Sequence, residues 1–169
     1  MKICKKKFKQ KFKLISSSSY VYSLDFGKIL DTLSAHTDDV TSVKYHKGQL
    51  LSGSKDSSVR VWKSYSNGSF AKVPIIEFEE HEAGVSCLNF DSTGNIAISG
   101  GSDGVILLYD LRTKQSIKKF VGHNHYISSI SFLGNDGNRI ISCSYDKSIR
   151  IHDTQGNVLS SFDANEPLK

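Results

Sequence analysis

The sequence predicts an all-β protein built from three consecutive repeats of four strands. Three segments align position for position: VTSVKYHKGQLLSGSKDSSVRVWK, VSCLNFDSTGNIAISGGSDGVILLYD and ISSISFLGNDGNRIISCSYDKSIRIHD. Each alternates branched or aromatic residues with polar ones, which is the period of a half-buried strand. The chain has only two prolines and no long stretch with a helical period. We therefore expect no helix outside the N-terminal tail.

The spacing of the repeats predicts their architecture. A histidine stands before each segment and an aspartate lies in a tight turn within it, and both recur after 42 to 47 residues. That period is close to the ~40–45 residues of one four-stranded blade of a β-propeller. The sequence thus predicts a disordered lysine-rich tail at 1–16 and a propeller domain at 17–169. Within the domain we expect a partial blade at 17–34 and complete blades at about 35–79, 80–121 and 122–163.

The net charge of +5 belongs to the tail. Residues 1–13 hold seven of the 22 basic residues and no acid, which leaves 15 basic residues against 17 acids in the rest. The folded part therefore lacks the basic footprint of a nucleic-acid-binding protein. Phe8, Phe12 and Ile15 fall at i, i+4 and i+7, so a helix there would be basic with a narrow apolar stripe. Such a helix would contact an anionic membrane weakly; a disordered tail is the favoured alternative.

The sequence gives little support for a membrane span, a disulfide framework or a metal site. No apolar run approaches the ~20 residues of a membrane span. Cys4, Cys87 and Cys143 form no disulfide framework, and buried reduced thiols in a cytosolic protein are expected. His123 and His125 have no further metal ligands at suitable spacing. We therefore expect neither a metal nor a cofactor.

Each repeat carries a histidine, a serine, an aspartate and a ring residue at fixed offsets. The serine stands four residues before the aspartate, and the ring residue stands six after it. The three sets are His36, Ser52, Asp56 and Trp62; His81, Ser99, Asp103 and Tyr109; and His123, Ser142, Asp146 and His152. These residue types can form a closed hydrogen-bond chain inside a blade, which satisfies groups that burial would otherwise make costly. Tyr109 and His152 are expected to close their chains with a hydroxyl and a ring nitrogen.

The same residue types also suit a Ser-His-Asp catalytic triad. A nucleophile needs an exposed serine beside an oxyanion hole, whereas all three serines lie in the middle of strand-like runs. The set also recurs at the blade period, for which catalysis gives no reason. The sequence therefore favours structural tetrads and no catalytic residue.

The repeats resemble those of the WD40 family over residues 20–162. The resemblance rests on SGSKD at 52–56, on VRVWK at 59–63, on Tyr109-Asp110 and on Gly122-His123. It is weaker where Ala35 and Glu80 replace the usual glycine before histidine, and where Lys63 replaces the aspartate after Trp62. The family resemblance implies a non-enzymatic scaffold that binds other proteins through the top face of a propeller.

In such propellers, partner contacts concentrate three and five residues after the blade histidine and one residue before the turn aspartate. The positions implied here are Asp39, Thr41, Lys55, Ser102, Tyr126 and Tyr145, together with Gly84, Ser86 and Ser128. Tyr126 and Tyr145 are the strongest candidates, because exposed tyrosines give a large contact area at low entropic cost.

A narrower resemblance starts at Tyr22. The segment YSLDFGKILDTLSAHTDDVTSVKYHKGQLLSGSKDSSVRVW is similar to the C-terminal propeller of FAN-type BEACH-domain proteins. The resemblance implies an adjacent BEACH domain, a cytoplasmic location peripheral at membranes, and a role in membrane trafficking or receptor-proximal signalling. The alternative is a WD40 subunit of another complex whose partner chain completes the propeller. In either case we expect the propeller to continue beyond the three blades.

Overall fold

The computed structural model describes residues 10–15, 18–23, 29–66, 68–134 and 137–163, with side chains from residue 31 onward. These residues form fifteen strands and no helix. None of them therefore belongs to a helix that could cross a membrane. The predicted all-β class is confirmed.

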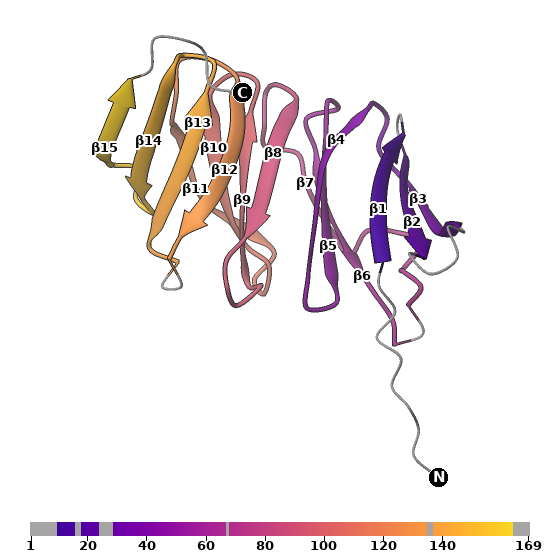
Figure 1. The fold of residues 1–169 in the computed structure, drawn as a ribbon. Coiled ribbons are helices and arrows are strands. Elements are labelled where there is room, and N and C mark those ends of the chain that lie inside the picture. The colour runs from indigo at the N-terminus through magenta and orange to yellow at the C-terminus, as the bar shows by residue number, and fades with distance from the viewer. Residues whose placement is uncertain (1–9, 16–17, 24–28, 67, 135–136, 164–169) are drawn as a thin grey trace.

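The strands form four antiparallel sheets that stand side by side in one row (Figure 1). Three sheets have four strands each, in sequence order, and are called blades one, two and three. Blade one holds β4 (Val40–His46), β5 (Gln49–Ser54), β6 (Val59–Lys63) and β7 (Ile76–Phe78). Blade two holds β8 (Val85–Phe90), β9 (Ile96–Gly101), β10 (Val105–Asp110) and β11 (Gln115–Val121). Blade three holds β12 (Ile127–Leu133), β13 (Arg139–Ser144), β14 (Ser148–Asp153) and β15 (Val158–Asp163).

The sheet before blade one has three strands, β1 (Gln10–Ile15), β2 (Ser18–Ser23) and β3 (Ile29–Ser34). Disorder was predicted for 1–16, and a helix was the alternative, but Gln10–Ile15 pairs antiparallel with β2. Both predictions are wrong for this segment. Its apolar and polar residues also alternate with the period of a strand, and pairing with β2 satisfies backbone groups that an isolated short helix would leave marginal. Residues 1–9 lie outside the described residues.

The core of the protein lies between the blades. Leu51, Val59 and Val61 of blade one pack with Val85 and Leu88 of blade two. A second apolar cluster joins blades two and three, and a third joins β3 to blade one through Leu33, Leu50, Trp62 and Phe70. Because blades one and two are each covered on both sides, their middle strands are buried along most of their length.

A β-bulge occupies the same place in the inner strand of every complete blade. The bulged residues carry hydroxyls: Thr41, Ser86 and Ser128. Thr41 Oγ1 contacts the carbonyl oxygens of Gly53 in its own blade and Val85 in the next. Ser86 Oγ repeats this arrangement with Gly100 and Ile127. The bulge thus aims one hydroxyl at two neighbouring blades and ties them together.

Candidate protein-interaction face and the polar chains beneath it

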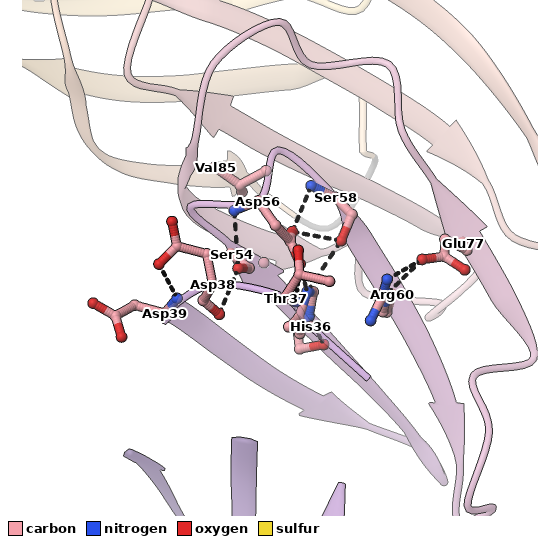
Figure 2. Close-up of polar contacts among 12 residues, drawn as sticks. His36, Thr37, Asp38, Asp39, Ser54, Asp56, Ser58, Arg60, Glu77 and Val85 are labelled. Atoms are coloured by element: carbon pink, nitrogen blue, oxygen red, sulfur yellow. Dashed lines mark hydrogen bonds and ion pairs between the residues drawn. The ribbon is translucent and has the colours of Figure 1, made fainter. Parts of the chain in front are cut away.

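Blade one contains a continuous polar chain from its turn to its third strand. His36 Nδ1 lies 2.9 Å from Asp56 Oδ2, and its Nε2 lies 2.8 Å from Ser52 Oγ. Trp62 Nε1 donates to the same serine oxygen at 2.9 Å. Ser58, which is not one of the predicted tetrad residues, contacts both His36 Nδ1 and Asp56 Oδ1. Figure 2 shows the turn end of this chain.

The partners fix the direction of these hydrogen bonds. Ser58 and the backbone amides of Ser58 and Thr37 donate to Asp56, which is an acceptor on both oxygens. His36 Nδ1 is therefore the donor toward Asp56, and Nε2 accepts from the Ser52 hydroxyl. Burial lowers the pKa of His36 and keeps the ring neutral. Burial opposes ionisation of Asp56, but the hydrogen bonds outweigh it and hold the pKa of this carboxyl well below its usual range.

Blade three repeats the turn end of the chain. His123 contacts Asp146 at 2.9 Å and Ser142 at 2.8 Å, and Ser148 takes the place that Ser58 has in blade one. His152 does not join. It is fully buried, and neither of its ring nitrogens has a hydrogen-bond partner within the described part of the chain.

The prediction that His152 closes this chain is therefore wrong. A phenol carries its oxygen outside the ring, whereas the nitrogens of imidazole are ring members, so this side chain extends less far toward Ser142. The His152 ring instead packs beside Phe120 and His123. Burial, followed by the neighbouring His123 and Arg150, lowers the pKa of His152 to about 4.

In blade two the polar chain is complete at its ring residue and interrupted at its turn aspartate. His81 Nε2 lies 2.7 Å from Ser99 Oγ, which lies 2.9 Å from the Tyr109 hydroxyl, so the tyrosine closes the chain as expected. Asp103 does not bond to His81, whose Nδ1 is buried without a partner among the described residues. Val105 stands where the other blades have serine, so the hydroxyl that joins histidine to aspartate is missing.

The burial of these tetrads fits the structural role predicted for them. The three tetrad serines are at most 1 % exposed, so no substrate reaches their oxygens. No group of three or more histidine, cysteine or acidic side chains suited to a metal ion occurs within the described ranges. Cys87 is buried, and burial raises the pKa of its thiol to about 11, so it is held in the protonated, unreactive form.

The predicted partner-contact residues gather in pairs above the tetrads, one pair per blade. In each pair, the amide of the residue before the turn aspartate donates to the carbonyl of the residue three after the blade histidine. The pairs are Lys55 with Asp39 at 2.9 Å, Ser102 with Gly84 at 2.9 Å, and Tyr145 with Tyr126 at 3.0 Å. Six residues from three blades thus occupy equivalent places on one face, here called the top face.

The three pairs differ in chemistry. Lys55 and Asp39 form an exposed ion pair of 3.0 Å. Gly84 and Ser102 present little side chain. Tyr126 and Tyr145 meet edge to face, with ring centroids 5.3 Å apart.

His125 enlarges the aromatic pair and was not predicted as a contact residue. Its ring stacks beside Tyr145 with centroids 6.3 Å apart, and both side chains are exposed. Its place directly before Tyr126 in the blade-entry loop was the available signal.

Thr41, Ser86 and Ser128 carry the hydroxyls of the bulges. The hydroxyls of Thr41 and Ser86 face carbonyls of two adjacent blades, and Ser128 Oγ donates to Cys143 O at 3.2 Å. The bulge turns the Thr41 and Ser86 hydroxyls toward the next blade and the Ser128 hydroxyl toward its own blade, so the three hydroxyls bond within the propeller; a role in partner contact stays a prediction.

Four-stranded blades in one row, each with a buried histidine bonded to a strand serine and, in blades one and three, also to the turn aspartate, define a WD40-type β-propeller. The family model described as nucleolar protein 10-like, N-terminal domain, matches residues 6–169. The chain belongs to this family of β-propeller domains.

Relatives with other descriptions share the same repeats. The chain is 27 % identical over 143 residues to autophagy-related protein 16 of Arabidopsis thaliana, covering 83 % of this chain and 27 % of that protein. It is 27 % identical over 138 residues to a guanine nucleotide-binding protein subunit beta-like protein of Encephalitozoon cuniculi, covering 78 % and 41 %. It is 34 % identical over 127 residues to nuclear distribution protein nudF of Emericella nidulans, covering 72 % and 28 %. The chain thus spans between about a quarter and two fifths of these relatives.

Proposed function

We propose that this chain is a protein-interaction scaffold whose top face binds partners through the aromatic group of His125, Tyr126 and Tyr145. The observation that carries the proposal is that the rings of His125 and Tyr145 are exposed, and that of Tyr126 half-buried, on a rigid support. Tyr145 is 41 % exposed, although its backbone is fixed to Tyr126. Aromatic side chains held in one conformation make favourable contact residues because little entropy is lost on binding.

The test is affinity capture from the source cells with the tagged full chain, followed by direct binding measurements with each captured protein. Tyr145→Ala and Tyr126→Ala are expected to weaken binding by about tenfold or more, which is the usual effect of losing an aromatic anchor. Tyr65→Ala is the matched control, because Tyr65 is 52 % exposed on the connection between β6 and β7. Unchanged binding of every partner by both top-face variants would exclude the proposal.

A narrower proposal, that the intact protein carries an adjacent BEACH domain and acts in membrane trafficking or receptor-proximal signalling, is supported by the sequence that starts at Tyr22. Its test is the coding sequence on both sides of this chain. A cytoplasmic location is proposed with it, and the family description, which names a nucleolar protein, supplies the alternative. Imaging of the tagged full-length protein distinguishes the two.

The alternative in which a partner chain completes the propeller has support in the flank of blade three. Phe78 of blade one pairs with Val59 and is buried, whereas Phe162, paired with Ile149 at the equivalent place, is 59 % exposed. An exposed apolar flank of this kind suits another blade. Mixing the chain with a captured partner and measuring the mass of the complex tests this assignment.

Weak membrane contact by the lysine-rich tail is also proposed. The lysines of residues 1–13 support it through attraction to anionic lipid, worth about 1 kcal/mol each near the surface. Co-sedimentation of the chain with phosphatidylserine vesicles tests it. Binding that persists after these lysines are replaced by glutamine would overturn it.

A further inference from the structure

The turn aspartate of blade two is left out of its polar chain. Asp56 and Asp146 each accept from a histidine, a serine hydroxyl and backbone amides in blades one and three. Asp103, in contrast, accepts from the amide of Val105 at 3.0 Å and is exposed. The carboxylate of blade two is therefore available on the top face.

A buried nitrogen without a hydrogen-bond partner lies near this carboxylate. His81 is 5 % exposed, and its Nδ1 has no hydrogen-bond partner within the described residues. A Cβ atom placed on Gly101 would touch both this nitrogen and Asp103 Oδ1, so the two groups lie on either side of the same small gap. In the other blades the equivalent gap is closed by a direct histidine–aspartate contact. In blade two this contact is absent and Asp103 is exposed.

The loop that carries the aromatic group packs against the same turn. The amides of Gly122 and His123 donate to Gly104 O at 2.9 and 3.0 Å. A Cβ atom on Gly104 would stand 3.2 Å from the carbonyl oxygen of His125. Asp103 is therefore next to the loop that presents the His125, Tyr126 and Tyr145 rings.

The neighbouring charges favour a cation. The exposed acids Glu80, Glu82 and Asp103 lie around one lysine, Lys119. Its Nζ contacts Glu82 Oε1 at 2.7 Å and Glu80 O at 3.3 Å, and the charge of Asp103 also acts on it. Three carboxylates around one ammonium group leave excess negative charge on this part of the surface.

We propose that Asp103, Glu82 and the ring faces of His125 and Tyr145 form a subsite for an arginine side chain of a protein partner. The carboxylates would accept from the guanidinium, while its plane rests on an aromatic ring. A guanidinium suits this arrangement because it is planar, stacks on aromatic faces and forms forked bonds to carboxylates. The proposal rests on the scaffold function and specifies the chemistry of its partner.

The test measures binding of a fluorescein-labelled peptide of alternating arginine and glycine to the full chain by fluorescence anisotropy. Asp103→Asn and Tyr145→Ala are each expected to weaken binding by about threefold or more, in line with the strength of exposed ion and cation–π contacts. Asp163→Asn removes an exposed acid on β15 and is expected to leave binding unchanged.

The variant Val105→Thr distinguishes a role of Asp103 in peptide binding from a role in stabilising the fold. Threonine supplies the missing hydroxyl and would draw Asp103 inward to His81, so the chain should become more stable while peptide binding weakens. Equal peptide binding by wild type, Asp103→Asn and Val105→Thr would overturn the proposal. No binding by the wild type would also overturn it, whereas the capture experiment with Tyr145→Ala and Tyr126→Ala decides the scaffold function separately.

Discussion

The hydroxyl of Ser58 lies 3.0 Å from Nδ1 of His36, and this contact distinguishes the joined polar chain of blade one from the interrupted chain of blade two. Blade three has the equivalent contact between Ser148 and His123 at 3.1 Å. In blade two Val105 occupies this position. His81 keeps its contact with Ser99, but its Nδ1 contacts neither a turn serine nor Asp103. Blade two also has Gly101 where the other blades have Ser54 and Ser144, so the side chains of this turn together decide whether a buried histidine nitrogen is satisfied.

Val105→Thr is expected to stabilise the protein. The added hydroxyl can contact His81 and Asp103 while the remaining methyl keeps part of the packing against the apolar cluster. We expect the free energy of unfolding to rise by about 0.5–1.5 kcal/mol, the usual net gain for one buried hydrogen bond. Urea unfolding at neutral pH measures it. Val105→Ala is the control and should be less stable than wild type; a Val105→Thr variant no more stable than Val105→Ala would contradict the expectation.

Ser52→Ala is expected to damage folding. Its oxygen serves both His36 Nε2 and Trp62 Nε1, so alanine leaves two buried polar atoms without a partner. The cost is about 1–3 kcal/mol for each atom. Urea unfolding gives the value, and Ser160→Ala on the exposed strand β15 is the matched control. A stable Ser52→Ala variant would show that water replaces the serine oxygen.

His152→Tyr is expected to complete the chain of blade three. Tyr109 reaches Ser99 in blade two at the equivalent position, so a phenol at 152 should reach Ser142. The gain should be about 1 kcal/mol at neutral pH. His152→Phe provides the control, because it removes the two unpartnered nitrogens without adding a hydroxyl. Equal stability of the two variants would mean that the hydroxyl finds no partner.

Stability is expected to fall in mild acid. Burial is the main cause that lowers the pKa of His81 and of His152 to about 4, whereas an unfolded histidine titrates near 6.5. Between these values the unfolded chain binds protons that the folded chain does not, so the stabilisation present above about pH 6.5 is lost as the pH falls toward 4. The stabilisation that ionised Asp56 and Asp146 contribute is lost only at a pH below this range, because the hydrogen bonds of the folded state lower the pKa of both carboxyls. Urea unfolding at several pH values measures the slope.

His152→Tyr should reduce this slope by at most about 1.4 kcal/mol per pH unit, which is the effect of one proton. Replacement of the exposed His125 by glutamine serves as the control. An identical slope in wild type and His152→Tyr would show that the ring at 152 takes no part in the acid response.

Gly104→Ala is expected to destabilise the protein severely. Gly104 has a φ of +82°, and a Cβ there would collide with the carbonyl oxygen of His123. Since backbone must move, we expect a loss above about 2 kcal/mol. Lys147→Gly at the equivalent turn position of blade three, where φ is +69°, should stay within about 1 kcal/mol of wild type. Thermal unfolding compares the two; a harmless Gly104→Ala would mean that the loop can shift.

Most of the fold could be predicted from the repeat pattern. Period-two alternation and the recurring His, Ser and Asp predicted three four-stranded blades, because strand period and blade length are local properties of a sequence. The same signal was ambiguous in the tail. At Phe12 and Ile15 an apolar spacing fitted a helix, and only pairing with β2 made the segment a strand.

The sequence predicted that the candidate contact residues occupy equivalent places, but it predicted only some of their contacts. Equivalent offsets placed Tyr126 and Tyr145 on the same face as Asp39 and Lys55. They could not reveal that a bulge turns the Thr41 hydroxyl toward the neighbouring blade, since that depends on strand register.

The sequence by itself determined the architecture and the residue types of each polar chain, since these repeat along the chain. The tertiary structure decided which chains are complete. His81 loses Asp103 where Val105 replaces a serine, and His152 fails to join Ser142 although the offsets are the same. The physical reason is that a hydrogen bond depends on the reach and direction of two side chains within about 3 Å, whereas a repeat pattern specifies only which residues stand in equivalent places.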